Sequence, residues 1–321
     1  MALALEPPVA PQLARPRATV PDGGGWAHEP KWDGFRTLAF VDDEEVYLQS
    51  RNGKPMRRYF PELQFPRGRY VLDGEIVIFG AEGRQEFDLL GQRVHPAESR
   101  IARLSVETPA RFIAFDLLSR EDEILLELGF AQRRAALEGL LGSLPDPGPA
   151  TVDLTPSTTD AGEAEPWLRG AEGVVSKQLA APYRPGERTG MVKVKRVRTI
   201  DAVVTGWRPG KEESTVGSLI LGLYDDSQEL RVVGHTSGFK AREKRELVGR
   251  LVPFETGERG RGDPSRWNNA RELEWVVLRP ELVVEVSFDH VSDGRIRHGT
   301  KIVRWREDKD PRDCKLEQLD A

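Results

Sequence analysis

Short apolar runs of strand length dominate the first two thirds of the chain. Alternating and β-branched residues are typical of strands, and such runs occupy six segments before residue 198: 35–41, 45–50, 70–79, 111–118, 173–177 and 191–195. Between residues 129 and 144 the apolar residues recur at helical spacing, which predicts a helix. Antiparallel strands with flanking helices indicate an α+β domain.

A second group of strands follows residue 198. These runs are 201–209, 218–226, 229–237, 275–280, 282–291 and 301–307, and helical spacing returns only at 241–251. Several short strands with a single helix favour a small β-barrel of the oligonucleotide-binding (OB) type. We therefore predict two domains, residues 1–198 and 199–321, with a hinge at 198–202.

The first 27 residues are rich in proline and glycine and predict an extended arm that wraps the surface of the first domain. They lack the basic, apolar and small-residue order of a signal peptide. No stretch reaches the roughly 18 to 20 consecutive apolar residues that a membrane helix needs. We therefore expect a cytoplasmic protein.

Composition narrows the possible chemistry. A chain of 321 residues with 38% apolar content can bury two separate cores. The single cysteine, Cys314, excludes an internal disulfide and any site built from several thiolates, and the five histidines show no metal-ligand spacing. A bound metal would therefore have oxygen ligands.

Positive charge is concentrated in one segment although the net charge is −5. Between Lys177 and Arg198 seven basic residues accompany a single acid, Glu187. Within this segment Lys193 and Lys195 lie on one face of a predicted strand, because strand side chains alternate. Two like charges side by side are costly unless an anion joins them, and polyphosphate is the natural candidate.

Lys31 precedes a turn in the segment KWDGFR. A lysine amine with its ordinary pKa of about 10.4 is neutral in only roughly a few molecules per ten thousand at pH 7. Covalent chemistry at this amine would need nearby cations or burial to lower that pKa, and the basic segment could supply the cations. By itself the motif is more often a solvated lysine before a turn.

Other polar residues interrupt apolar strands in the same half of the chain. Glu75 lies within the run LDGEIVIF, where a carboxylate must be paired, hydrogen-bonded or metal-bound. Phe115 ends a strand and is either a core residue or a platform for a purine. Arg51 lies beside a glycine turn, where it either binds an anion or is solvated. Glu172 precedes a short apolar strand that ends at Lys177.

Taken together, these segments resemble the nucleotidyltransferase motif series of the ATP-dependent DNA ligases. The segments KWDGFR, SRNGK, DGEIVIF, FDLL, EGVVSK, MVKVK and RWREDK are similar in order and spacing to motifs I, Ia, III, IIIa, IV, V and VI. The likeness spans nearly the whole chain and is greatest to the small C-type ligases of bacteria, which consist of a nucleotidyltransferase domain and an OB-fold domain. One departure is Met191, where the family often has an aromatic residue.

The resemblance implies a role for each matching residue. Lys31 would attack the α-phosphorus of ATP and carry AMP, with Lys193 and Lys195 neutralising the phosphate. Arg36 and Arg51 would contact phosphate and the 5′-phosphate strand. The remaining assignments are a catalytic role for Asp33, stacking on adenine for Phe115, a nucleotide contact for Glu29, a ribose or metal contact for Glu75, a metal ligand for Glu172, and triphosphate contacts for Arg306, Asp308 and Lys309.

The family likeness also implies cofactors and partners. These are ATP with Mg²⁺ or Mn²⁺, nicked duplex DNA as the substrate, and DNA repair proteins as possible partners of a monomeric enzyme. Alternatives within the superfamily are an mRNA capping guanylyltransferase, which would use GTP, and an RNA ligase. An alternative from another class is a non-catalytic nucleic-acid-binding protein that keeps the motifs only as architecture.

Overall fold

In the computed structural model the chain forms two compact units, residues 1–196 and 197–321. The sequence analysis had put the boundary between residues 198 and 199. The structure describes residues 3–80, 83–142, 151–195, 198–261, 274–288, 291–292, 294–296 and 300–319. The expected hinge at 198–202 is the start of a long strand of the second unit.

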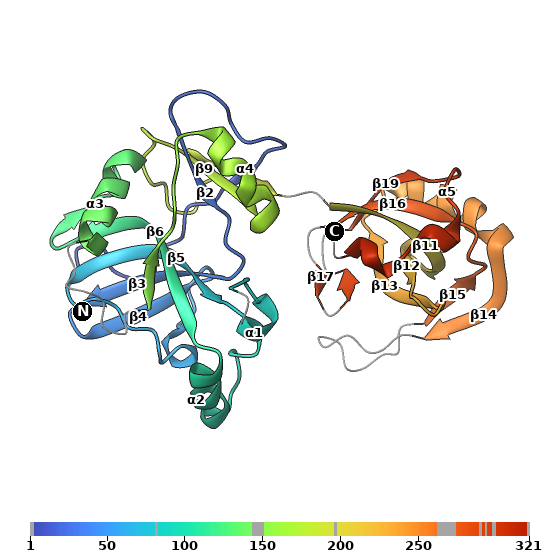
Figure 1. Cartoon of the computed structure of the whole chain (residues 1–321), viewed down its shortest axis with the longest axis horizontal. Coiled ribbons are helices and arrows are strands. Elements are labelled where there is room, and N and C mark those ends of the chain that lie inside the picture. Colours follow the sequence, from blue (N-terminus) through green and yellow to red (C-terminus); the bar gives the residue numbers. More distant parts are fainter. Residues whose placement is uncertain are drawn as a thin grey trace. The chain divides into compact units, whose positions relative to one another are not determined.

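The larger sheet of the first unit is built around its two longest strands, which pair antiparallel although helices separate them in sequence (Figure 1). Its order is β4-β3-β5-β6-β7, all antiparallel, and β8 pairs with β6 in parallel. The strands are β3 (Phe35–Asp42), β4 (Glu45–Ser50), β5 (Arg69–Ile78), β6 (Ala110–Arg120), β7 (Glu123–Ile124) and β8 (Val152–Leu154). The buried apolar residues of β3, β5 and β6 form the main core of this unit.

A smaller sheet brings together segments that are far apart in sequence. Its order is β1-β10-β9-β2, and β2 and β10 run antiparallel to β9. The strands are β1 (Arg15–Pro16), β2 (Trp26–Pro30), β9 (Gly173–Gln178) and β10 (Met191–Lys195). This sheet therefore places the chain just before Lys31 beside the strands that follow Glu172 and end at Lys195.

Helices flank both sheets of the first unit. The predicted helix at 129–144 is α3 (Phe130–Gly142), which packs on β6. The sequence analysis did not predict α1 (Phe87–Gly91), α2 (Glu98–Glu107) or α4 (Ala161–Gly170). α4 packs on β2 and β9 and contains Pro166, a residue that usually marks the end of a helical pattern.

The N-terminal arm is part of the core, as well as wrapping the surface as predicted. Leu3 and Val9 are buried in a cluster with apolar residues of the large sheet and with Tyr183. The Gln49 side chain accepts from the Val9 N–H at 3.0 Å and donates to the Val9 carbonyl at 2.6 Å. The arm around Val9 is thus held by side-chain hydrogen bonds, whereas β1 further along the arm pairs with β10.

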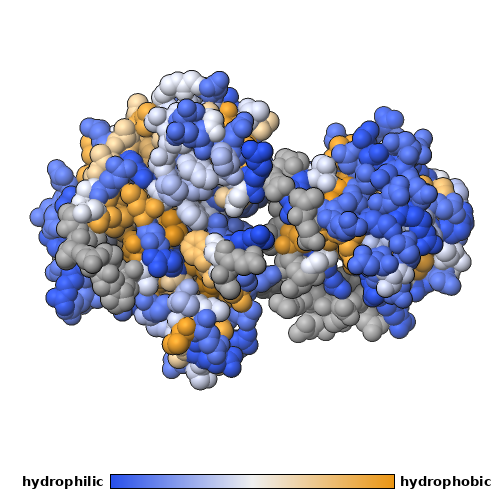
Figure 2. Space-filling view, viewed as in Figure 1, coloured by the Kyte–Doolittle hydropathy of each residue, from blue (hydrophilic) through white to orange (hydrophobic). Residues whose placement is uncertain are grey.

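The second unit has the predicted OB-type architecture. Its central strand β11 pairs with β12 on one edge and with β15 and β16 on the other, so the sheet curves around one core, while α5 (Ala241–Leu251) lies where predicted. The strands are β11 (Arg198–Pro209), β12 (Val216–Tyr224), β13 (Leu230–Ser237), β14 (Glu255–Arg261), β15 (Glu274–Leu278), β16 (Val283–Phe288), β17 (Val291–Ser292), β18 (Arg295–Ile296) and β19 (Lys301–Trp305). Figure 2 shows a largely hydrophilic surface on this unit.

None of the helices in the described ranges is both long enough and apolar enough to cross a membrane.

Candidate active site

Lys31 lies at the end of β2, where the small sheet meets the large one. Its backbone N–H continues the pairing with the neighbouring strand by donating to the Gly173 carbonyl at 2.9 Å. The next residue, Trp32, donates from its indole to Thr155 Oγ1 at 2.8 Å, and the Asp33 N–H donates to Gln85 Oε1 at 2.7 Å. Hydrogen bonds therefore hold three consecutive residues, 31 to 33, in place. The Lys31 side chain itself keeps 20% of its surface exposed.

Gly34 allows this turn to lie close to the large sheet. A Cβ atom at position 34 would be 2.2 Å from the Ile76 carbonyl oxygen and 2.9 Å from the Glu75 side chain. No side chain larger than hydrogen fits there without a backbone shift. The glycine of the KWDG motif is thus required by packing between the Lys31 turn and β5.

Glu172 joins Lys31 to Lys195. Its carboxylate is 2.7 Å from Lys195 Nζ through Oε1 and forms a hydrogen-bonded ion pair with Lys31 Nζ through Oε2. The β9–β10 register, which pairs Gly173 with Lys195, brings these groups together. Burial acts to raise the pKa of Glu172, but Lys31 and Lys195 outweigh it, so this pKa lies below its ordinary value.

Lys193 shares a face of β10 with Lys195, as the alternation predicted. Burial, together with the positive charges of Lys31 and Lys195, lowers the pKa of the Lys193 ammonium. Arg51, in the exposed turn after β4, adds a further positive charge to the surroundings of Lys193. Four of the predicted cationic residues thus surround one location that suits a bound phosphate.

Arg36 and Glu75 are direct neighbours across β3 and β5. The guanidinium of Arg36 donates from Nε and Nη2 to the buried Asp73 carboxylate at 3.0 and 2.7 Å. Burial raises the pKa of Glu75 to about 8, although Lys31 and Arg36 oppose this shift. Glu75 and Glu172 both lie near Lys31, so two oxygen donors of the kind Mg²⁺ or Mn²⁺ prefers are close to the Lys31 amine. In the described ranges no group of three or more His, Cys, Asp or Glu residues forms a candidate metal site.

Phe115 lies beside two cationic side chains. The guanidinium carbon of Arg36 is 5.4 Å from the centre of its ring, and Lys177 Nζ is 4.8 Å from it. Lys177 also donates to the Phe115 carbonyl at 2.8 Å and lies 2.9 Å from Glu29 Oε2. Arg36 and Phe115, both assigned to the nucleotide, are therefore in contact.

Glu29 is buried and paired with two cations. Besides Lys177, Arg134 of α3 approaches it at 3.5 Å, and only 3% of the Glu29 side chain is exposed. Burial raises the pKa of Glu29, and the positive charges of Lys177 and Arg134 oppose this shift. Glu29 thus lies behind Phe115, and its carboxylate is already fully engaged by protein groups.

The motif VI residues belong to the second unit. Arg306 donates to both Asp201 carboxylate oxygens at 2.9 Å and also pairs with Asp308 at 2.9 and 3.0 Å. Lys309 is 3.9 Å from Asp313. In this structure the motif VI residues therefore form ion pairs within the second unit. The sequence did not single out Asp201, a partner of Arg306.

Sequence reasoning missed the buried residues that support the site. One of them is Asp116, which pairs with Arg133 at 2.8 Å and lies 4.0 Å from Lys177 Nζ. Asp73 and Asp116 lie inside motifs that were recognised, and their position in apolar strands was a signal like the one that pointed to Glu75. Lys177 was noticed as a basic residue at the end of a short strand, without a partner or a role at the site. Tyr183 and Arg134 carry no local signal, since they reach the site from a loop and from a helix that are distant in sequence.

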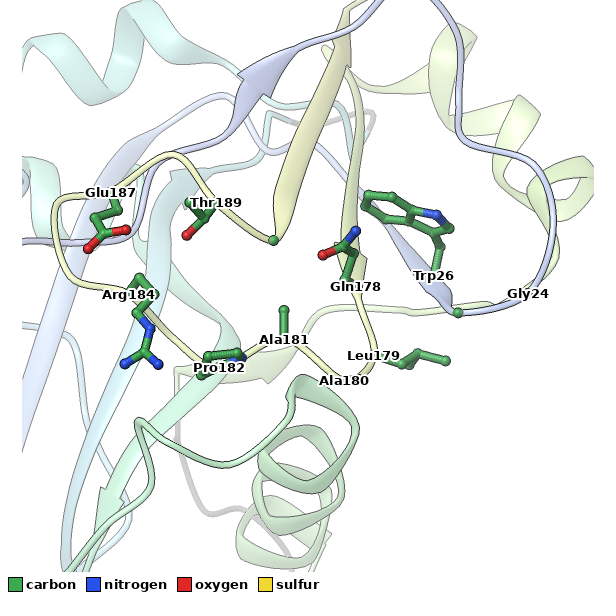
Figure 3. Close-up of a pocket in the computed structure, with 12 residues that line it drawn as sticks. Gly24, Trp26, Gln178, Leu179, Ala180, Ala181, Pro182, Arg184, Glu187 and Thr189 are labelled. Carbon is green, nitrogen blue, oxygen red and sulfur yellow. The ribbon is translucent and has the colours of Figure 1, made fainter.

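The open pocket in Figure 3 lies away from Lys31, Glu172, Lys193 and Lys195. It is lined by Trp26, Gln178, Arg184 and Thr189, among others, and contains none of the predicted site residues. Trp26 and Gln178 are at the ends of β2 and β9 opposite to Lys31 and Glu172. The pocket and the cationic cluster therefore occupy opposite ends of the small sheet.

Comparisons with known proteins agree with the motif order. The family model of the ATP dependent DNA ligase domain matches residues 10–195, and the model of the ATP dependent DNA ligase C terminal region matches residues 212–309. DNA ligase C1 of Mycolicibacterium smegmatis is 42% identical over 341 aligned positions, which cover 100% of this chain and 96% of that protein. DNA ligase C of Mycobacterium tuberculosis is 42% identical over 349 positions, with the same coverage.

Solved structures show the same two-unit fold. The ligase domain of LigD from M. tuberculosis is 29% identical, with a TM-score of 0.54, covering 95% of this chain and 97% of that one. A mycobacterial DNA ligase D complexed with ATP and MES is 28% identical, with a TM-score of 0.53 and the same coverage.

Proposed function

Since the chain belongs to the ATP-dependent DNA ligase family, we propose that it seals 5′-phosphate/3′-hydroxyl nicks in duplex DNA through an adenylate carried on Lys31. The observation that carries this proposal is the cluster of Lys31, Glu172, Lys193 and Lys195 at the junction of the two sheets. An amine among cations beside an accessible surface suits attack on a polyphosphate.

The first step forms the lysyl adenylate. The deprotonated Lys31 amine attacks the α-phosphorus of ATP, a nitrogen–phosphorus bond forms, and the bond from the α-phosphorus to the bridging oxygen breaks to release pyrophosphate. Lys31 Nζ must first leave its ion pair with Glu172 and lose a proton. Lys193 and Lys195 then stabilise the negative charge that builds up on the α-phosphate oxygens.

Two further steps complete the sealing reaction. A 5′-phosphate oxygen at the nick attacks the adenylate phosphorus, and the bond to Lys31 Nζ breaks to give DNA-adenylate. The 3′-hydroxyl then attacks the 5′-phosphate and AMP leaves. We assign Arg36 and Arg51 to phosphate in these steps. Arg36 adjoins Glu75, which is also close to Lys31, and Arg51 adds positive charge around Lys193. We assign Asp33 to catalysis because it belongs to the Lys31 turn.

We propose Mg²⁺ or Mn²⁺ as the metal, with Glu75 and Glu172 as its protein ligands. Both are carboxylates near Lys31, which fits a hard divalent cation. When bound, such a cation would stabilise negative charge on phosphate oxygens. Glu75 would have to be ionised to bind it, and a nearby dication favours ionisation of a carboxylate whose pKa is raised to about 8.

The base pocket is assigned to Phe115 and Glu29. We propose that adenine stacks on the Phe115 ring, which has cationic groups beside it, and that the ribose lies near Glu75. Glu29 is assigned to the nucleotide from the family motif. Its pairing with Lys177 and Arg134 supports an indirect contribution through the shape of the pocket.

We assign Arg306, Asp308 and Lys309 to the triphosphate during the first step. In the structure Arg306 is held by Asp201 and Asp308, so it must exchange these partners to bind a phosphate. We further propose a monomer that acts in DNA repair in the bacterial cytoplasm, where nicked chromosomal DNA, its substrate, is found.

Labelling with nucleotide tests the proposed chemistry. The protein is incubated with α-labelled ATP or GTP and magnesium, denatured, and separated by electrophoresis. We expect a labelled adduct with ATP and none with Lys31→Ala, whereas Lys211→Ala, an exposed lysine in the second unit, keeps it. An adduct formed preferentially with GTP would favour a guanylyltransferase, and no adduct with the native protein would favour a non-catalytic binder. Sealing of a 5′-phosphorylated nick, compared with a nick that contains ribonucleotides, separates DNA ligation from RNA ligation.

A further inference from the structure

Arg36 is held by a carboxylate that is itself completely buried. The Asp73 side chain has 0% of its surface exposed, while that of Arg36 keeps 19%. The guanidinium uses Nε and Nη2 for Asp73, and none of the described residues accepts a hydrogen bond from Nη1. Asp73 thus fixes the plane of the guanidinium and leaves one edge of it available to a phosphate.

The Asp73 carboxylate accepts a third hydrogen bond, in addition to the two from Arg36. The hydroxyl of Tyr183, in the loop between β9 and β10, donates to Asp73 Oδ2 at 2.7 Å, the same oxygen that accepts from Arg36 Nη2. Only 1% of Tyr183 is exposed. A buried carboxylate requires such donors, so the tyrosine decides where the Asp73 oxygens lie and, through them, where Arg36 lies.

Tyr183 is in turn held by the N-terminal arm. The Gln12 N–H donates to the Tyr183 hydroxyl oxygen at 2.9 Å, so the phenol hydrogen is free to point at Asp73. The Gln12 side chain donates to the Thr189 carbonyl, and the Leu13 N–H donates to the Glu187 carbonyl at 2.8 Å. The arm and the 179–190 loop are therefore bound to each other at several points.

These contacts form one continuous chain of hydrogen bonds from the arm to motif I. We infer that Tyr183, oriented by the Gln12 N–H, is a positioning residue that holds the Asp73–Arg36 pair in the geometry needed to bind the phosphate of the nick. The inference rests on the phosphate role proposed above for Arg36. In this inference the N-terminal arm contributes to the geometry of the active site through the Gln12 N–H, in addition to packing against the core.

The test compares two buried tyrosines. Tyr183→Phe removes the hydroxyl that joins Gln12 to Asp73. Tyr70→Phe removes the hydroxyl of an equally buried tyrosine, which among the described residues bonds to the Pro66 carbonyl alone. For adenylated enzyme and a 5′-phosphorylated nick, we expect kcat/KM to fall about tenfold in Tyr183→Phe, as for the loss of a hydrogen bond to a charged group. Tyr70→Phe should seal like the native protein.

A double-mutant cycle with Arg36→Ala separates positioning from general destabilisation. If Tyr183 acts through Arg36, Tyr183→Phe causes no further loss in the Arg36→Ala background. The inference is wrong if the two losses multiply, or if Tyr183→Phe alone seals normally while Arg36→Ala is impaired. If Arg36→Ala itself seals normally, the phosphate role of Arg36 fails, and the inference with it.

A second pair of variants covers the case in which Tyr183→Phe does not fold. Gln12→Pro removes the N–H that orients Tyr183, whereas Gln12→Ala keeps this N–H and loses only the side-chain bond to Thr189. We expect a lower kcat/KM for the nick in Gln12→Pro than in Gln12→Ala. Equal values in two folded variants would overturn the inference.

Discussion

Glu172 links Lys31 to Lys195 through the two oxygens of one carboxylate, at 2.7 Å on the Lys195 side. Residues 31 and 172 are 141 positions apart, and the β2–β9 pairing brings them together. In the proposed mechanism this carboxylate holds the Lys31 amine in place before the nucleotide binds, and it must release the amine for the first step.

Glu172→Gln tests this link. The neutral amide keeps the shape but loses both ion pairs and the proposed metal ligand, so we expect adenylation to slow by about tenfold to a hundredfold. Rapid-quench measurement of the lysyl adenylate reads this rate directly. Glu44→Gln, which affects only an exposed pair with Arg67, is the matched control and should react at the native rate. Native adenylation in Glu172→Gln would rule out the proposed role.

Arg51→Ala should separate the two halves of the reaction. Arg51 is exposed and close enough to add to the positive charge around Lys193, so its loss weakens phosphate binding without disturbing the core. We expect kcat/KM for the nick to fall about tenfold, with a steeper loss at higher salt, while the rate of adenylation changes less than threefold. Arg67→Ala, another exposed arginine, serves as control. A larger effect on adenylation than on sealing would contradict the assignment to the 5′-phosphate strand.

The raised pKa of Glu75 predicts how stability varies with pH. The folded protein holds a proton on Glu75 up to about pH 8, whereas the unfolded chain loses it near the ordinary carboxylate pKa of about 4.3. Between these values the folded state binds more protons, so this group's contribution to the free energy of unfolding decreases as pH rises. Glu75→Gln removes that decrease.

The melting temperatures of Glu75→Gln and the native protein, taken from pH 5 to pH 8.5 without a divalent metal, check this sign. The melting temperature of Glu75→Gln should rise relative to that of the native protein as pH rises. We expect a difference of a few degrees, because Glu75 is only partly buried by surface area. Glu165 is an exposed residue on α4, so the melting temperature of Glu165→Gln should differ from that of the native protein by the same amount at every pH. If the melting temperature of Glu75→Gln falls or stays constant relative to that of the native protein as pH rises, the raised pKa of Glu75 is contradicted.

Gly34→Ala should damage both stability and catalysis. The added methyl group would meet the Ile76 carbonyl oxygen at 2.2 Å, so the Lys31 turn or β5 must move. We expect the free energy of unfolding to fall by about 1–3 kcal/mol, as for other overpacked sites, and adenylation to slow at least tenfold. Gly24→Ala, where the methyl group meets no atom within 4 Å, should change neither. Denaturant unfolding together with adduct formation tests both effects.

The sequence alone predicted the longer strands of both units and singled out the lysines of the cationic cluster, but it missed β2, β8 and β14. Runs of apolar and β-branched residues marked β3, β5, β6 and β11, and the spacing of Lys193 and Lys195 placed them on one face. Such patterns are local, because side-chain direction along a strand depends only on the strand itself. The motifs around Lys31 are equally local, which is why they could be read in order.

The partners of these residues were decided only by the tertiary structure. That Asp73 is shared by Arg36 and Tyr183, or that Gln12 reaches Tyr183 across 171 positions, depends on strand register and on which groups lose contact with water. Neither property is visible in a single sequence, since a buried carboxylate is paired with whichever donors the packed chain brings to it. The same reason explains α4, which forms despite Pro166 because it packs against β2 and β9.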